Sequence, residues 1–291
     1  VTTPIGKYEP KPEQSIELLK ELHILTRDGK LNQDTRRKLK QVQHLLGFIE
    51  PLLRAVAGKT TGNDVHLVDH GAGKSYLGFL LYDAYFKQGL AGKLGGTVTG
   101  IETRTELVER SATLAQRFGF DGMRFVNAAI ADTMRESATN GQHALPPRVD
   151  IVTALHACDT ATDDAIAFGL AHNAQHMVLV PCCQAEVAAC LRANKPNAQT
   201  LQNNPLAELW RRPIHTREFG SQLTNVLRCL QLESHGYEVT VTELVGWEHS
   251  MKNELIVASR TANTAKATNT VSSASKASAQ RLASLLALSG L

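Results

Sequence analysis

Residues 65–81 read VHLVDHGAGKSYLGFLL, and this stretch decides the fold. A short apolar run ends at Asp69 and is followed at once by two glycines, Gly71 and Gly73, and then by apolar residues at helical spacing. This order predicts a strand that enters a glycine turn and opens a helix. Glycine lacks a Cβ, so it allows a sharp turn and a close approach of the backbone to a ligand. The first N–H groups of the helix are free to donate to that ligand.

Two acidic residues stand at the ends of consecutive predicted strands. Asp69 closes the first strand, and Glu102 closes the second, which spans residues 97–102. An acid directly before the glycine turn repels a pyrophosphate and suits a ligand that carries a cation or hydroxyl groups. An acid at the end of the second strand is placed to accept hydrogen bonds from both hydroxyls of a ribose. The pattern D-x-G-x-G-K also lacks the third glycine of a dinucleotide-binding turn.

An acid followed by G-x-G resembles the first motif of the class I S-adenosylmethionine-dependent methyltransferases. The resemblance implies an enzyme that uses S-adenosylmethionine as its cofactor. It implies that Asp69 accepts from the cofactor's ammonium, that Glu102 holds the ribose, and that the glycines let the methionine part approach the backbone. The residues expected to contact the cofactor are Asp69, His70, Gly71, Ala72, Gly73, Glu102, Ala129, Ile130 and His156. A glycine turn in an unrelated α/β protein is the alternative.

Short apolar runs alternate with helical patterns beyond the turn. They predict strands at residues 65–69, 97–102, 124–128, 149–155, 176–181, 237–245 and 254–259. Strands that alternate with helices pair in parallel through right-handed crossovers. Only residues 246–253 separate the last two strands, which is too short for a crossover helix, so these strands are expected to pair antiparallel. The predicted fold class is α/β: a Rossmann-like, seven-stranded, mostly parallel sheet that ends in an antiparallel hairpin.

Three segments are expected along the chain. Residues 1–62 have apolar positions at helical spacing and form a small helical N-terminal module. Residues 63–260 form the S-adenosylmethionine-binding methyltransferase domain. Residues 261–291 are rich in Ala, Ser and Thr and form a low-complexity tail expected to be disordered, although its last residues can form a short amphipathic helix. The N-terminal module carries a basic face that is either solvated or in contact with RNA, with Arg36, Arg37, Lys38 and Lys40.

Histidine, cysteine and acidic residues follow the fourth and fifth strands. The two segments read LHACDTATD at residues 155–163 and PCCQ at residues 181–184. This pair resembles a subgroup of class I enzymes that includes the Trm13-type tRNA 2′-O-methyltransferases and the methyltransferase-like 25 proteins. Neighbouring strands of such a sheet bring the segments together at its carboxyl edge. We expect His156 and Asp159 to be catalytic, because they follow the fourth strand and can orient the methyl acceptor or take its proton.

Two other interpretations of the cysteines remain open. His156, Cys158, Cys182 and Cys183 are residue types that bind zinc, but their spacing lacks the usual C-x2-C pattern. Adjacent cysteines on a strand also point in divergent directions. Free cysteine commonly serves as a small buried apolar residue instead. We therefore assign no metal ligands.

The composition limits the partners and the compartment. No apolar run approaches the ~20 residues of a membrane-spanning helix, so no membrane partner is expected. Five cysteines, an odd number, argue against a disulfide framework and favour a reducing cytoplasm. A net charge of +3 permits RNA as a partner without requiring it. No pattern in the sequence defines an oligomeric state.

The favoured function is methyl transfer from S-adenosylmethionine to RNA, either tRNA or rRNA. The basic N-terminal module supports it, as does an insertion at residues 194–219 where Trp210 stands among arginines. An ordinary surface insertion explains the same residues. The alternatives are an enzyme that methylates a protein side chain or a small molecule, and a non-catalytic, cofactor-binding scaffold of the same fold.

Overall fold

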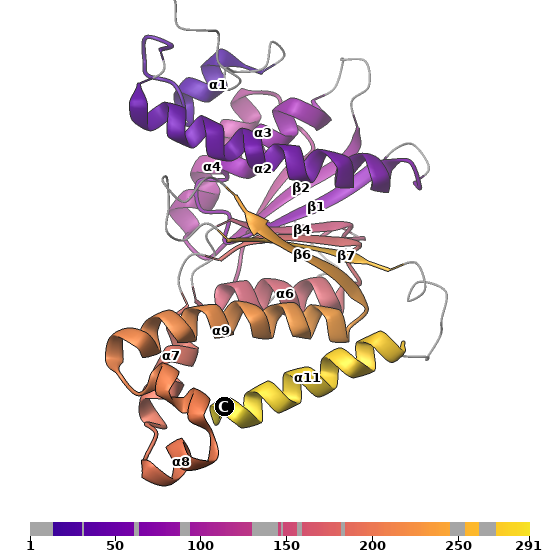
Figure 1. Ribbon diagram of the computed structural model, residues 1–291. Helices are drawn as coiled ribbons and strands as arrows, with labels where there is room; N and C mark the ends of the chain where they lie inside the picture. Colours follow the sequence, from indigo (N-terminus) through magenta and orange to yellow (C-terminus); the bar gives the residue numbers. More distant parts are fainter. Residues whose placement is uncertain are drawn as a thin grey trace, which may run out of the picture.

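A sheet of seven strands runs through the protein, with helices on both of its faces (Figure 1). The computed structural model describes residues 14–30, 32–60, 64–87, 94–129, 145–146, 148–155, 159–181, 184–244, 254–261 and 272–291. Its strands are β1 (Asp64–His70), β2 (Gly95–Glu102), β3 (Met123–Asn127), β4 (Ile151–Leu155), β5 (His176–Val180), β6 (Tyr237–Glu243) and β7 (Glu254–Arg260).

The strand order β3-β2-β1-β4-β5-β7-β6 confirms the predicted sheet. Strands β1 to β5 pair in parallel, whereas β7 pairs antiparallel with both β5 and β6. Chain order reverses on either side of β1, because β2 lies on one flank and β4 on the other. Ligands of open α/β sheets bind beyond the carboxyl ends of the strands at such a switch in order. The topology therefore makes the ends of β1, β2 and β4 the edge of the sheet where a ligand is expected.

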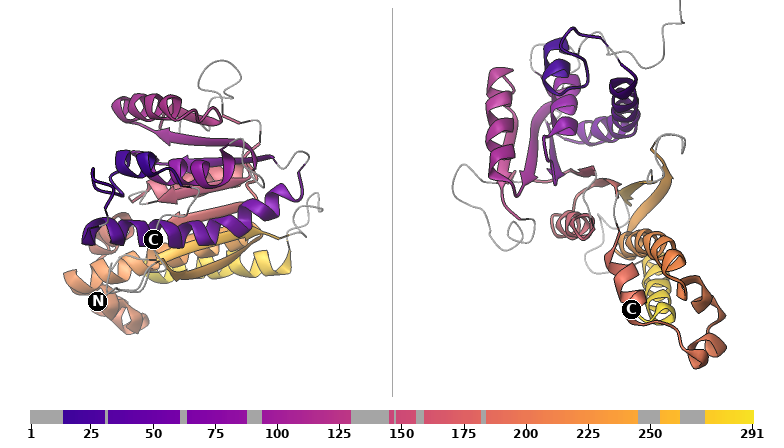
Figure 2. Two further views of the ribbon diagram at one scale, coloured as in Figure 1. Left: turned by 90° about the horizontal axis from the view of Figure 1, so that it is seen from above. Right: turned by 90° about the vertical axis from the view of Figure 1, so that its left-hand side faces the viewer.

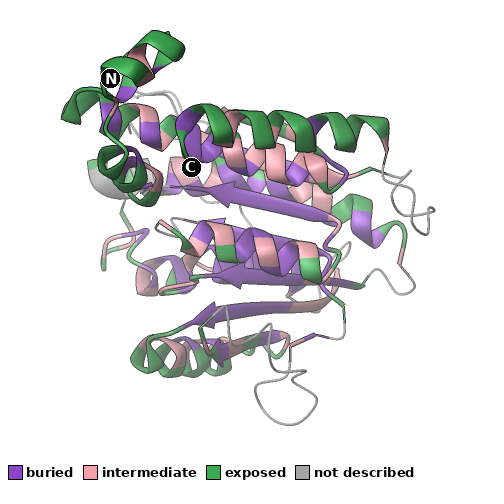
Figure 3. Ribbon diagram, turned by 90° about the horizontal axis from the view of Figure 1, so that it is seen from below, coloured by how far each residue is buried: buried purple, intermediate pink, exposed green. Residues whose placement is uncertain are grey.

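The helices form two layers on opposite sides of the sheet (Figure 2). One layer holds α1 (Ile16–Glu21), α2 (Gln33–Ala57), α3 (Tyr76–Leu81) with its π-helical continuation η2 (Tyr82–Phe86), and α4 (Thr105–Arg117). The other holds α6 (Ala161–Ala171), α7 (Glu186–Ala193), α8 (Ala198–Asn203), the 3-10 helix η3 (Pro205–Trp210), α9 (Pro213–Ser234) and α11 (Ser273–Ser289). The central strands are buried while the helices expose their outer faces (Figure 3). The core thus lies between the sheet and each helical layer.

The N-terminal helices share a hydrophobic cluster with the sheet. Leu18 of α1 and Leu46 of α2 are buried in the same cluster as Val65 of β1 and Phe79 of α3. Polar contacts reinforce this packing, because the buried Asp83 carboxylate accepts a hydrogen bond from the Ser15 N–H at 2.8 Å. The module is therefore packed against the sheet as part of one core, and a domain boundary near residue 62 stays a prediction.

The insertion at residues 194–219 is largely helical, and its tryptophan faces inward. Trp210 is only 5% exposed and stacks on Phe219 of α9 with a centroid distance of 5.4 Å. It packs in a cluster with Leu191 and Leu223 that joins η3 to α7 and α9. Trp210 is therefore unavailable to stack on a nucleic-acid base, although the neighbouring Arg211, Arg212 and Arg217 are exposed.

The tail differs from the expectation of disorder. Residues 273–289 form α11, which lies along α9 (Figure 1). Ser272 caps the helix N-terminus by accepting from the Ser275 N–H at 3.1 Å, and Gly290 ends it in a left-handed conformation. Small Ala and Ser side chains permit this close approach, and Ser278 donates a hydrogen bond to Glu233 of α9. A segment with few large apolar residues can therefore still pack as a helix against its neighbour.

No helix within the described ranges combines the length and apolar content that a membrane crossing requires.

Candidate cofactor site

The turn after β1 folds against β2 through its own backbone. Gly71 and Gly73 have φ values of 60° and 58°, in the left-handed region that favours glycine. The Ala72 N–H donates to the Ile101 carbonyl of β2 at 3.0 Å, and the Ser75 N–H donates to the Ala72 carbonyl at 2.7 Å. Because Ser75 is also left-handed, with a φ of 53°, α3 begins only at Tyr76.

Gly100 of β2 is a site residue that the sequence analysis did not identify. A Cβ at this position would lie 3.1 Å from the Ser75 Oγ and 3.2 Å from the Ala72 Cβ. The turn can therefore lie on the sheet only because β2 has no side chain beneath it. A glycine inside a predicted strand, where it costs stability, was the signal for such a close approach.

Asp69 is a buried acid whose charge is poorly solvated. It is 2% exposed, and its Oδ1 accepts a hydrogen bond from the Thr153 hydroxyl of β4 at 2.6 Å. Burial raises the pKa of Asp69 to about 7, against the smaller opposing effect of the Thr153 hydrogen bond. A carboxyl group with this pKa is stabilised as an anion by a nearby cation such as an ammonium.

Glu102, at the end of β2, is held in the ionised form. Its Oε2 accepts from the Gly73 N–H at 2.8 Å, and its Oε1 accepts from the backbone N–H and the Nε of Arg104 at 3.1 and 3.0 Å. Burial acts to raise the pKa of Glu102, but the hydrogen bonds from Arg104 and Gly73 outweigh it and lower the pKa to about 2. The result is a fixed anion. Its oxygens also accept from the Thr103 hydroxyl and the Arg104 Nη2, both at 3.3 Å, so a hydroxyl of a ligand would compete with these two longer hydrogen bonds.

The two predicted acids therefore meet at one edge of the sheet, with the glycine turn between them. The hydrogen bond from Gly73 to Glu102 joins the turn to the second acid directly. Asn127, at the end of β3, donates to the carbonyls of Glu102 and Thr103 at 3.1 and 2.9 Å, so the third strand end is tied to the same point. Ala129 follows as an exposed residue beyond β3, and Ile130 lies outside the described residues.

His70 turns its side chain away from Asp69, as alternation along a strand requires. The imidazole is fully buried and packs edge-on against Phe168 of α6, with ring centroids 4.4 Å apart. Neither ring nitrogen has a hydrogen-bond partner among the described residues. Burial lowers the pKa of His70 to about 3, so the ring is neutral. Only the backbone of His70 is placed to approach a ligand on the Asp69 side.

Asp159 bridges the segments that follow β4 and β5. Its backbone is left-handed, with a φ of 51°, and its Oδ1 accepts from the N–H groups of Ala185 and Glu186 at 3.0 and 3.2 Å. The carboxylate thereby caps the first turn of α7, where an anion is stabilised by the helix dipole. The other predicted catalytic residue, His156, lies outside the described residues, as do Cys158, Cys182 and Cys183.

A buried arginine that sequence analysis missed anchors this side of the sheet. Arg228 of α9 is 1% exposed and pairs with Asp163 of α6 through two hydrogen bonds of 2.8 and 2.6 Å. It also donates to the Asp159 carbonyl at 2.8 Å and to the Asn225 Oδ1 at 3.1 Å. The buried face of α9 mixes polar residues such as Thr224 and Asn225 with Leu223 and Leu232, so the sequence pattern did not set Arg228 apart as a buried, paired charge.

Asn225 extends the network to two further strand ends. Its side chain donates to Glu254 at the start of β7 at 2.7 Å and accepts from Gln184 at 3.3 Å. Asp159, Gln184 and Glu254 are the first described residues after segments 156–158, 182–183 and 245–253, respectively. One hydrogen-bonded network therefore connects Asp159, Gln184 and Glu254, the described residues that follow the three segments. Among the described residues, no group of three or more His, Cys, Asp or Glu could hold a metal ion, and the cysteines of the zinc hypothesis lie outside that part of the chain.

Comparison with protein families identifies the class of the protein. Residues 37–190, more than half of the chain, match the family model of a methyltransferase domain. The chain belongs to this family, and it is an S-adenosylmethionine-dependent methyltransferase. The seven-stranded sheet and the glycine turn flanked by two acids fit that cofactor. No curated protein matches the sequence.

Solved structures of methyltransferases show a distant similarity. TrmK of M. capricolum, solved with S-adenosylhomocysteine, is 11% identical with a TM-score of 0.39, covering 72% of this chain and 67% of that one. The magnesium protoporphyrin IX methyltransferase of Synechocystis PCC 6803 is 14% identical with a TM-score of 0.43, covering 85% and 95%. An rRNA methylase of Streptococcus thermophilus is 8% identical with a TM-score of 0.40, covering 73% and 95%. At these values the structures carry no argument about the substrate.

We predict that cofactor affinity rises with pH through the titration of Asp69. Below pH 7 an ammonium must displace the proton that burial keeps on Asp69, so affinity for S-adenosylmethionine should increase by up to about tenfold per pH unit between about pH 5.5 and pH 7. Calorimetric titration at several pH values measures this slope. Asp69→Asn should bind more weakly with little slope, and an unchanged slope in that variant contradicts the assignment.

The same pKa has an opposite consequence for the protein without cofactor. The folded state keeps the Asp69 proton up to about pH 7, whereas an unfolded aspartate releases it near 3.8. The folded state thus binds more protons between these values, and the free energy of unfolding contributed by Asp69 falls as pH rises through that window.

Glu102→Ala is expected to weaken S-adenosylmethionine binding by at least about tenfold, because charge-assisted hydrogen bonds to the ribose are lost. Calorimetry measures the change. Glu106→Ala is the matched control, since Glu106 is an exposed acid in the first turn of α4 and also lies near Arg104. Equal affinity of the Glu102 variant and the unmodified protein would remove Glu102 from the site.

Asp163→Ala is expected to destabilise the fold by about 2–3 kcal/mol, because Arg228 stays buried with only its two uncharged acceptors. Urea unfolding measures the change, and Asp164→Ala, an exposed acid at the next position, is the control. The double variant Asp163→Ala/Arg228→Met should recover part of the loss, since it removes the buried charge. A double variant no more stable than Asp163→Ala would refute the buried-charge explanation.

Proposed function

We propose that the protein transfers the methyl group of S-adenosylmethionine to RNA, with tRNA or rRNA as the substrate class. The observation that carries the choice of RNA is a set of exposed cations on the N-terminal module. Arg27, Lys30 and Arg36 are exposed around the connection from α1 to α2, and none makes an ion pair with a described residue. Unpaired surface cations are what phosphate contacts require. Arg37 and Lys38 belong to the same segment, but the structure does not describe their side chains.

We further propose that the turn and its two acids hold the cofactor. Asp69 would accept from the ammonium, Glu102 from the ribose hydroxyls, and the backbone of residues 70–73 would line the methionine part. Ala129 and Ile130 would flank the adenine. When bound, S-adenosylmethionine supplies a methyl group that is activated by the positive charge on sulfur. The fixed Glu102 anion and the buried Asp69 fit a ligand with hydroxyls at one end and a cation at the other.

The catalytic residues of this proposal belong to the segments that follow β4 and β5. We propose that His156 orients the acceptor or takes its proton, from its place directly after β4. Asp159 would act chiefly as a positioning residue, because two N–H groups of α7 already engage its Oδ1. Membership of the Trm13-type and methyltransferase-like 25 subgroup remains part of this proposal, supported by the HACD and PCC segments of the sequence.

A labelling experiment tests the substrate class. The protein is incubated with methyl-labelled S-adenosylmethionine and separate total RNA, protein and small-molecule fractions of a cell extract. We expect label in the RNA fraction that ribonuclease releases, and much less label at subsaturating cofactor when Glu102→Ala replaces the unmodified protein. Label in the protein or small-molecule fraction instead would contradict RNA and support the corresponding alternative acceptor. Cofactor binding with no transfer to any fraction would support a non-catalytic scaffold.

A further inference from the structure

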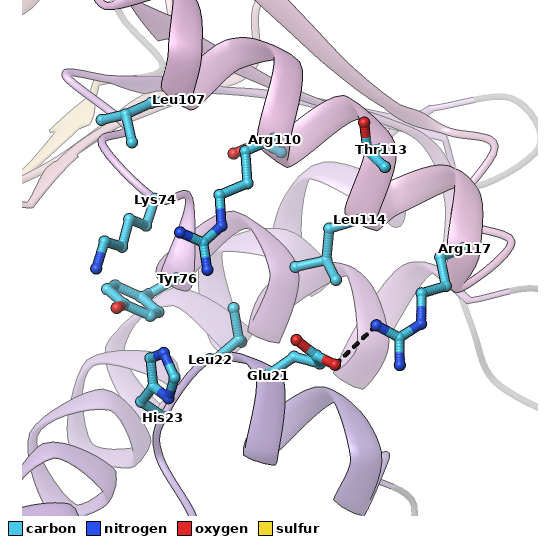
Figure 4. A pocket seen from close by; sticks show the side chains of 11 residues that line it. Glu21, Leu22, His23, Lys74, Tyr76, Leu107, Arg110, Thr113, Leu114 and Arg117 are labelled. Carbon is cyan, nitrogen blue, oxygen red and sulfur yellow. Dashed lines mark hydrogen bonds and ion pairs between the residues drawn. The ribbon is translucent and has the colours of Figure 1, made fainter.

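A cavity of about 240 Å³ lies between α1, α3 and α4, beside the cofactor turn (Figure 4). Lys74 and Tyr76, which follow Gly73 directly, line one end. Arg117 of α4 closes the other end, where it forms an ion pair of 2.7 Å with Glu21 of α1. The cavity therefore connects the cofactor turn to the N-terminal module without containing either Asp69 or Glu102.

Positive charge exceeds negative charge along this cavity. Lys74 and Arg110 are exposed, line the cavity from the turn before α3 and from α4, and make no ion pair with any described residue. Figure 4 shows both side chains extending toward the part of the cavity where Tyr76 and His23 lie. Glu21 is the acid among the lining residues, and its charge is offset by Arg117. An anion that enters the cavity can therefore pair with Lys74 and Arg110 without displacing a carboxylate of the described residues.

His23 contributes a strained residue to the same cavity. Its φ of 54° is left-handed, and its N–H donates to the Lys20 carbonyl at 3.0 Å in the turn that ends α1. Glycine or asparagine usually occupies this position after a helix, because other side chains adopt it at a cost. Strained residues of this kind cluster where a ligand is held. The imidazole lines the cavity, as Figure 4 shows.

We infer that this cavity binds a phosphodiester group of the RNA substrate, an inference that rests on the proposed function. Arg110 and Lys74 contact the phosphate oxygens, the Arg110 guanidinium with several N–H donors and the Lys74 ammonium as a point charge. Tyr76 and His23 offer an aromatic wall and further donors to the adjoining ribose. The volume is below the roughly 300–1,000 Å³ of pockets for drug-sized ligands, which suits one phosphate with its sugar and excludes a base pair.

The position of the cavity also defines a path for the RNA strand along the protein surface. Arg27 and Lys30 follow His23 in the chain and are exposed, while Lys74 adjoins the cofactor turn at the other side. An RNA strand with one phosphate in the cavity therefore runs from the N-terminal module toward the carboxyl edge of the sheet. Contacts to phosphate position a nucleic acid without reading its sequence. The cavity fixes the location of the substrate relative to the methyl group and leaves base choice to other segments.

Charge reversal on α4 tests the inference with the full-length protein and bulk tRNA as the probe. We expect Arg110→Glu to lower affinity at least tenfold and to reduce the slope of log K against log salt concentration by about 0.7–0.9 for each lost phosphate contact. Arg192→Glu is the control, because Arg192 is exposed on α7 in the opposite helical layer and makes no ion pair with a described residue. S-adenosylmethionine affinity should be unchanged in both variants.

His23→Gly separates a binding role from a structural one. Glycine relieves the left-handed strain, so the thermal unfolding midpoint should equal or exceed that of the unmodified protein. Affinity for tRNA should nevertheless fall, because the imidazole donors are lost. A variant that is as stable as the unmodified protein and binds tRNA equally well would overturn the role of His23 and weaken the whole site.

The failure of the inference is distinguishable from failure of the proposed function. If the unmodified protein binds tRNA with a salt-dependent affinity and Arg110→Glu behaves like Arg192→Glu, the cavity is not the phosphate site although RNA remains the substrate class. If the unmodified protein shows no salt-dependent binding to RNA and methylates an acidic protein instead, both the inference and the proposed substrate are overturned.

Discussion

The hydrogen bond from the Gly73 N–H to the Glu102 carboxylate is the contact on which the proposed cofactor site depends. It holds the turn after β1 against the end of β2, where Gly73 is left-handed and Gly100 has no side chain to crowd Ala72 and Ser75 of the turn. Glu102 remains ionised although it is buried, because Gly73 and Arg104 supply the hydrogen bonds that water would otherwise give. The Gly73 N–H thus holds the turn in place and, together with Arg104, keeps the Glu102 carboxylate charged.

The two halves of the sheet edge are built by different means. At β1, β2 and β3, backbone N–H groups and short polar side chains shape the site around the glycine turn. At β4, β5 and β7, the buried Arg228 and its partner Asn225 fix the points where three segments re-enter the fold. Backbone contacts suit a cofactor of constant shape.

The strands, the antiparallel pairing of the last two and the position of the two acids were predictable because they follow from local sequence. Buried parallel strands appear as short apolar runs, and the 246–253 gap excludes a crossover helix. The burial of Trp210, the docking of α11 and the pairing of Arg228 were not predictable, since each depends on contacts between residues distant in sequence. The contact between His70 and Phe168 was not predictable either. The alternation of side chains along a strand predicts which residues share a face, but it does not predict which helix packs on that face.

A crystal structure of the protein with S-adenosylhomocysteine is the most direct test of the central claim. The account predicts both ribose hydroxyls within hydrogen-bond distance of the Glu102 carboxylate, the ammonium within reach of Asp69 directly or through one water, and the Gly73–Glu102 hydrogen bond kept. An adenosyl group bound elsewhere, or a ribose that Glu102 does not touch, would contradict it.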